Sequence, residues 1–114
     1  MKYLLIALMC FVMCLFLLIP VISRAAGLQH ESITVSDTAI GFTSSLITYP
    51  VFGATCTLET GQIRFWLDGT DPTSSEGHLL EIGQSIGLTN GVQIGNFRAI
   101  KTGVTSGVLR CSYE

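Results

Sequence analysis

The stretch Ile63-Arg64-Phe65-Trp66-Leu67-Asp68-Gly69-Thr70-Asp71-Pro72-Thr73-Ser74-Ser75 decides the fold of this chain. Its apolar residues at odd-numbered positions, from Ile63 to Leu67, share one face, while Arg64 and Trp66 lie on the other. This alternation with a period of two is typical of a β-strand with one buried side. The stretch therefore predicts a strand that ends abruptly in a polar turn.

The polar half of the stretch has the residues that turns require. Asp68 can accept hydrogen bonds from backbone amides of its own turn, Gly69 tolerates a positive φ, and Asp71 with Pro72 fixes a second bend. The alternative is a metal site, because Asp68, Asp71 and Glu76 place three carboxylates within nine residues. Calcium needs six to eight oxygen ligands, and this spacing does not match known calcium loops. We therefore expect a structural turn and no metal or other cofactor.

Outward from this stretch, the chain is a series of short alternating or β-prone segments separated by turns that contain glycine. We expect Leu79 and Leu80 to return to the core after the turn, and Asn90-Gly91 to form a tight hairpin turn. No window of ten residues after the N-terminal segment has helical periodicity. The pattern predicts an all-β domain, a single antiparallel sandwich or small barrel of six to eight strands between Glu31 and Tyr113. The β-prone segments are 31–35, 39–42, 45–48, 53–59, 63–67, 84–88, 96–101 and 108–113.

The N-terminal segment is hydrophobic and predicts a helix, the one helix we expect in the chain. Residues 3–22 include no charged side chain. Ser23-Arg24-Ala25 has the small residues that favour signal cleavage before Ala26, whereas an apolar run of this length also suits a retained membrane anchor. The chain therefore divides into a signal peptide or membrane anchor (1–25) and a β domain (26–114). Both alternatives predict an extracytoplasmic protein, either periplasmic, secreted or membrane-anchored.

Charge and composition argue against several functions. Residues 26–114 have four basic side chains against eight acidic ones, a net charge of −4 with no basic cluster, so we expect no nucleic-acid binding. His30 and His78 belong to no recognisable catalytic or metal motif, and Ser74-Ser75 near His78 lacks a nucleophile elbow. We therefore expect no enzymatic activity.

The four cysteines fall into two groups. Cys10 and Cys14 lie in the hydrophobic segment, where they serve as ordinary apolar residues, and the methionines before them do not favour lipidation. Cys56 and Cys111 lie in predicted strands on the inward face. Two inward cysteines of an exported domain either form a disulfide or stay as buried thiols, and the sequence leaves both open.

Trp66, the one tryptophan in the chain, lies on the face opposite to Ile63 and Phe65. It is either a core residue of a second layer or an exposed aromatic side chain. An exposed Trp66 beside Arg64 could contact a protein partner or stack on a sugar. Arg64 and Trp66 are therefore the candidate contact residues.

The motifs also carry a family resemblance. Asp68-Gly69-Thr70-Asp71-Pro72-Thr73, then Glu76-Gly77-His78-Leu79-Leu80, then Phe97-Arg98-Ala99-Ile100 resemble small β-sandwich proteins encoded among bacteriophage virion genes. Residues 63–75, with Phe97–Lys101 and Gly103, also look like the immunoglobulin-like accessory domain at the C-terminus of chitobiase and β-hexosaminidase. The resemblance covers about residues 54–113. It implies an immunoglobulin-like β-sandwich that acts as a structural protein.

Two functions follow as hypotheses. The first is a structural or interaction protein, an accessory subunit of a virion or cell-envelope assembly whose partners are other protein subunits. The hydrophobic leader fits a membrane-containing virion or an envelope protein, with a membrane contact through residues 3–22. The alternative is a module that binds surface glycans through Trp66 and nearby polar turns.

Overall fold

The computed structural model describes residues 2–17, 29–48 and 50–114. Helix α1 (Lys2–Leu17) is apolar after its first residue, as predicted for the hydrophobic segment. No helix of the described residues has both the length and the apolar character needed to cross a membrane. The remainder of the predicted leader, including the cleavage position before Ala26, lies outside the described residues.

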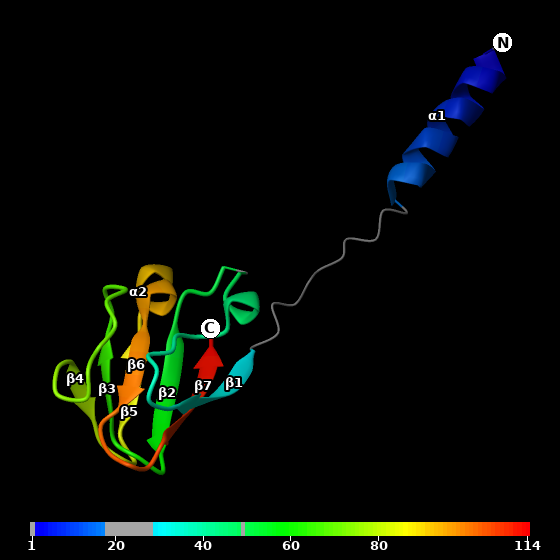
Figure 1. The fold of residues 1–114 in the computed structure, drawn as a ribbon. Helices are drawn as coiled ribbons and strands as arrows, with labels where there is room; N and C mark the ends of the chain where they lie inside the picture. The colour runs from blue at the N-terminus through cyan, green and yellow to red at the C-terminus, as the bar shows by residue number, and fades with distance from the viewer. Residues whose placement is uncertain (1, 18–28, 49) are drawn as a thin grey trace.

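The β domain has seven strands in two antiparallel sheets, which agrees with the expected six to eight (Figure 1). One sheet has four strands in the order β1-β7-β2-β5, and the other has three in the order β4-β3-β6. The last strand of the domain, β7, therefore lies inside its sheet between β1 and β2. The strands are β1 (His30–Val35), β2 (Ala54–Glu59), β3 (Ile63–Trp66), β4 (His78–Leu80), β5 (Ser85–Leu88), β6 (Arg98–Lys101) and β7 (Gly107–Tyr113).

The core consists of inward side chains from both sheets. In β2, β3 and β7 every second residue is buried, as the period of two predicts. Phe97 is 1% exposed and Phe65 is 8% exposed, and their rings lie 5.8 Å apart, which confirms that both belong to the interior. Phe42 stacks on Phe97 at 4.5 Å and meets Tyr113 edge-on at 5.7 Å. These aromatic rings connect the two sheets.

The segments 39–42 and 45–48 are not strands, contrary to the sequence-based prediction. Ile40 makes an isolated bridge to Ala99, and Ser44–Leu46 forms a 3₁₀ helix. The physical cause is Glu31, whose carboxylate accepts hydrogen bonds from the amide of Thr43 at 3.0 Å and from its hydroxyl at 2.6 Å. This contact holds the chain in a bend that no neighbouring strand pairs with.

The predicted hairpin turn at Asn90-Gly91 is also wrong, because Asn90 begins the short helix α2 (Gly91–Asn96). The Asn90 side chain accepts a hydrogen bond from the Gln93 amide at 2.9 Å, and the Gln93 side chain accepts one from the Thr89 amide at 2.9 Å. Such reciprocal side-chain bonds satisfy amides at the start of a helix. The expectation that the only helix lies in the leader is therefore wrong.

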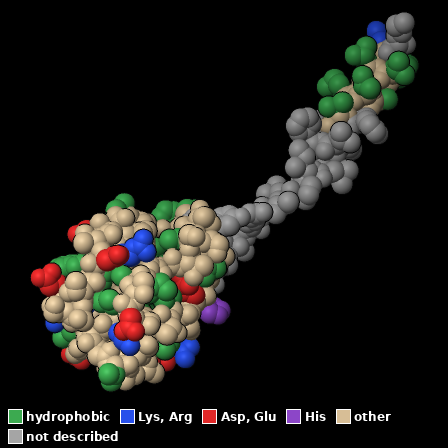
Figure 2. Space-filling view, viewed as in Figure 1, with side chains coloured by type: hydrophobic (Ala, Val, Ile, Leu, Met, Phe, Trp, Pro, Cys, Tyr) green, Lys and Arg blue, Asp and Glu red, His purple; other side chains and the backbone are tan. Residues whose placement is uncertain are grey.

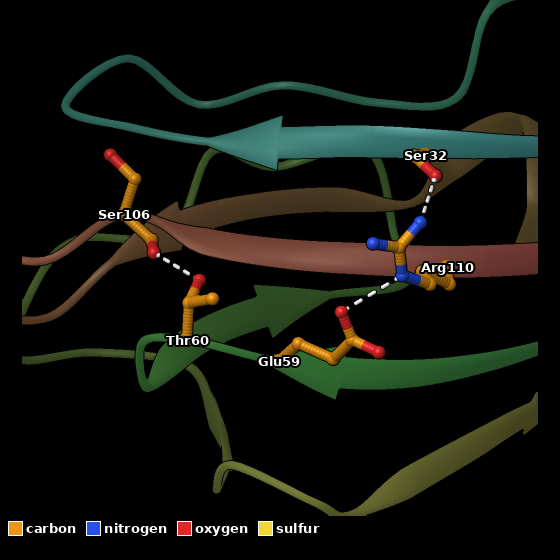
Figure 3. A network of polar contacts seen from close by, with 5 residues as sticks. All are labelled: Ser32, Glu59, Thr60, Ser106 and Arg110. Carbon is orange, nitrogen blue, oxygen red and sulfur yellow. Dashed lines mark hydrogen bonds and ion pairs between the residues drawn. The ribbon is translucent and has the colours of Figure 1, made fainter.

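The outer face of the four-stranded sheet is polar and bonded within itself (Figure 3). Arg110 of β7 donates from Nε to Glu59 of β2 at 2.8 Å and from Nη1 to Ser32 of β1 at 3.0 Å. Near this group, the Thr60 hydroxyl donates to the Ser106 carbonyl at 2.8 Å. The charges on this face already have partners within the domain.

Tyr113 connects the two ends of the β domain. Its side chain is buried, and its hydroxyl donates a hydrogen bond to the carboxylate of Glu31, to which Thr43 also donates. Burial disfavours the phenolate, and the adjacent carboxylate adds to this effect, so the pKa of Tyr113 is raised far above its usual value of about 10.

We expect the domain to lose stability above about pH 10. The pKa of Tyr113 is higher in the folded chain than in the unfolded chain. Its contribution to stability is therefore complete at pH values below the pKa of the unfolded chain, and it is lost as the pH rises toward the pKa of the folded chain. Thermal unfolding between pH 7 and 11 measures the effect. Tyr113→Phe keeps the ring but not the hydroxyl, so its melting temperature should fall less steeply. Equal slopes for the two proteins would contradict this prediction.

Candidate functional site

The candidate site is the outer face of the three-stranded sheet, which we call the β3 face: Arg64, Trp66, Leu79 and Ile100. Arg64 lies opposite Leu79 of β4 and Ile100 of β6. Directly opposed residues of antiparallel strands project from the same side of a sheet. Leu79 is 44% exposed, and the other three side chains are half-buried. The face therefore combines Arg64 with three large apolar side chains, and Arg98 of β6 lies opposite Trp66 at its border.

Leu79 was expected to re-enter the core together with Leu80, and this is wrong for Leu79. Leu80 is 4% exposed, whereas Leu79 is 44% exposed, because successive side chains of a strand point to opposite faces of the sheet. Period-two alternation applied to 78–80 would have assigned only one of the two leucines to the core. The same reasoning applied to β6 identifies Ile100, which the sequence-based prediction also missed.

Arg64 is the cation of the β domain that lacks a carboxylate partner among the described residues. Its Nη1 donates to the Gly77 carbonyl at 2.7 Å, and its Nε is buried without a hydrogen-bond partner in the described chain. The other three cations lie in ion pairs: Lys101 with Asp37 at 3.1 Å, Arg110 with Glu59 at 2.8 Å, and Arg98 with Asp71 at 3.9 Å. The charge of Arg64 thus has no counter-ion within the described chain.

Trp66 is half-buried, so the exposure of its side chain is intermediate between that of a core residue and that of a fully exposed one. Its indole meets the imidazole of His78 edge-on at 5.1 Å, and the same imidazole lies 5.4 Å from the ring of Phe65. His78 is itself exposed at the start of β4. The contacts hold Trp66 in one position while part of its surface stays accessible to a partner.

The loop after β3 is a structural turn. The Thr70 amide donates to the carboxylate of Asp68 at 2.9 Å, and this bond lowers the pKa of Asp68 below its usual value. Gly69 has φ +85°, a conformation that favours glycine, and its amide donates to the carbonyl of Asn96 at 3.0 Å. Pro72 is buried. The bond from Gly69 attaches the turn to the end of α2.

The carboxylates of this loop do not converge. Asp68 is occupied by its own turn, and Asp71 faces Arg98 of β6 at 3.9 Å, with both side chains largely exposed. The described residues include no group of three or more His, Cys, Asp or Glu side chains arranged to hold a metal ion. The loop therefore serves to position the end of β3.

Cys56 and Cys111 lie opposite each other on β2 and β7 and form a disulfide. Both are buried, and the bond lies within the four-stranded sheet. The sequence placed both cysteines on the inward face but left the pairing open, because strand order cannot be read from alternation. Cys10 of α1 is a free, exposed thiol.

Charged side chains are dispersed over the face of the β domain that is seen in Figure 2. Figure 2 shows Lys and Arg side chains next to acidic ones, separated by hydrophobic and neutral surface. Comparison with known protein families, curated proteins and solved structures finds no match to this chain. The geometry of the β3 face is therefore the basis for assigning a function.

Proposed function

We propose that this chain is a non-enzymatic interaction protein, an extracytoplasmic accessory subunit of a virion or cell-envelope assembly. Its β domain is an immunoglobulin-like sandwich of the kind found among bacteriophage virion proteins. The hydrophobic leader and the disulfide support an oxidising location outside the cytoplasm, where disulfides persist. The leader also provides a membrane contact if it is retained.

The observation that carries this proposal is the contrast between the two outer faces. The four-stranded sheet presents small polar side chains and charges that are already paired, whereas the β3 face presents Trp66 and the unpaired Arg64 between Leu79 and Ile100. Tryptophan and arginine dominate the energetic centres of protein interfaces. A protein partner with a carboxylate surrounded by apolar groups would satisfy both the charge and the apolar surface.

Co-purification tests the proposal. Tagged full chain is isolated from its native source, and the co-purifying subunits are quantified for wild type, Trp66→Ala and Arg64→Ala. We expect each variant to weaken capture of the partner by about 30-fold, the loss that corresponds to roughly 2 kcal/mol at an interface hot spot. The matched control is Thr57→Ala on the outer face of the other sheet, which should retain the partner.

The outcomes separate the candidate functions. Equal capture by all four proteins would contradict a role for the β3 face. Binding to a carbohydrate array that is lost in Trp66→Ala, without any protein partner, would instead support the glycan-binding alternative. Melting temperatures of the variants establish that each remains folded.

A further inference from the structure

The β5 edge differs from the other three sheet edges. β4 has only three residues and is flanked by Glu76 and Glu81. The edge of β6 is bonded to Ile40, whose amide and carbonyl both pair with Ala99. Charges, short length and covering segments are the usual means by which proteins protect sheet edges.

The edge of β1 is also protected. Glu31 places a charge in this strand, and its carboxylate holds the Thr43 segment through two hydrogen bonds. The amide of Lys101 donates to the carbonyl of Ser36 just after β1 at 3.1 Å. The inward-pointing charge of Glu31, a usual protection of an edge strand, therefore distinguishes β1 from a neutral edge.

β5 has four residues, and within the described chain neither a charged side chain nor a neighbouring segment protects its edge. No charged residue occurs between Glu81 and Arg98, so the strand and its flanks are neutral. The Leu58 amide donates to the Gln84 carbonyl at 3.0 Å, which identifies Gln84 as a residue that faces β2. Because hydrogen bonding alternates along an antiparallel strand, the amides and carbonyls of Ser85 and Gly87 point away from β2. Within the described chain these groups make no hydrogen bond.

We propose that β5 is a self-association edge, which pairs with β5 of a second copy of this chain around a two-fold axis at Ile86. In this register Ser85 of each copy lies opposite Gly87 of the other, and each pair exchanges two N–H···O=C bonds. All the outward backbone groups of the strand are then satisfied, and two four-stranded sheets become one continuous sheet.

A second copy fits this edge better than an unrelated strand for two reasons. The free groups are symmetric about Ile86, so one strand complements an identical antiparallel one. The contact also brings no like charges together, although the β domain is acidic as a whole. A side chain added at Gly87 would meet no atom within 4 Å, so the sheet face next to this edge is open, and the exposed Ile82 lies close to the edge in sequence.

The test compares the full chain with Gly87→Pro and Gly87→Ala in detergent micelles by sedimentation equilibrium. Proline removes the outward N–H of residue 87 and leaves the bonds to β2 intact, which edge strands tolerate. Alanine retains the N–H and serves as the matched control. The leader is the same in all three proteins, so association through it contributes equally. We expect wild type and Gly87→Ala to dimerise alike, and Gly87→Pro to dimerise at least tenfold more weakly.

A second measurement does not depend on the folding of a variant. Amide hydrogen exchange at Ser85 and Gly87 in the wild-type chain should slow as protein concentration rises, while exposed amides outside β5 do not change. A wild-type chain that stays monomeric up to about 1 mM would overturn the proposal. So would a folded Gly87→Pro that dimerises as tightly as wild type. Neither result bears on the β3 face, because the two surfaces share no residue.

Discussion

Replacing Phe97 with alanine is expected to lower the free energy of unfolding by about 3–5 kcal/mol, which is most of the stability of a domain of this size. Phe97 is 1% exposed and stacks against Phe42 at 4.5 Å and Phe65 at 5.8 Å. Its removal therefore opens a cavity between the two sheets, and Phe42 and Phe65 each lose one of their aromatic contacts. Phe65→Ala should have a similar effect at the other end of the same aromatic cluster.

Chemical denaturation of Phe97→Ala, Phe65→Ala and Asp68→Ala, side by side, tests this prediction. Asp68 bonds only within its own turn, so Asp68→Ala should shift the transition far less than either Phe variant. If the turn were a ligand site, Asp68→Ala would abolish ligand binding while its unfolding stayed unchanged. Near-wild-type stability of Phe97→Ala would contradict the packing described above.

Loss of the Cys56–Cys111 disulfide is expected to cost about 2–4 kcal/mol. The two cysteines are 55 residues apart in sequence, so the bond restricts a large part of the unfolded chain. The double variant Cys56→Ala/Cys111→Ala removes the bond without leaving an unpaired thiol in the core. Its denaturation midpoint should fall strongly relative to Cys10→Ser, which removes an exposed thiol of α1.

Peptide mapping without reduction identifies the bond directly. We expect one cross-linked peptide pair that includes Cys56 and Cys111, and its disappearance after reduction. Alkylation of both cysteines in the unreduced, denatured protein would show two free thiols and contradict the prediction.

Alternation along single strands was sufficient to predict much of the fold. β2, β3 and β7 bury every second residue, so their inward faces follow from the order of polar and apolar residues alone. The turn after β3 was equally predictable, because Asp68 and Gly69 satisfy requirements that lie within a few residues of each other. Local signals of this kind depend only on neighbouring residues in the sequence.

The features that were missed depend on distant or competing contacts. The bend at Thr43 exists because Glu31 and Tyr113, which lie 82 residues apart, meet in space and present a carboxylate to it. Asn90-Gly91 suits a hairpin as well as a helix start, and Gln93 decides in favour of the helix. The β3 face depends on strand order, which places Leu79 and Ile100 on either side of Arg64, and no local pattern specifies that order.

The position of β7 determines when this domain can fold during synthesis. Because β7 lies between β1 and β2 in the four-stranded sheet, neither strand can form its pairing with β7 until residues 107–113 have been synthesised. At about 5–20 residues per second, the ribosome needs roughly 4–14 s to extend the chain from Val35 to Gly107. Throughout that interval β1 is an unpaired segment available to chaperones and to translocation machinery. We therefore expect the nascent domain to remain unfolded until after its last strand has emerged, which is the state that passage through a protein-conducting channel requires.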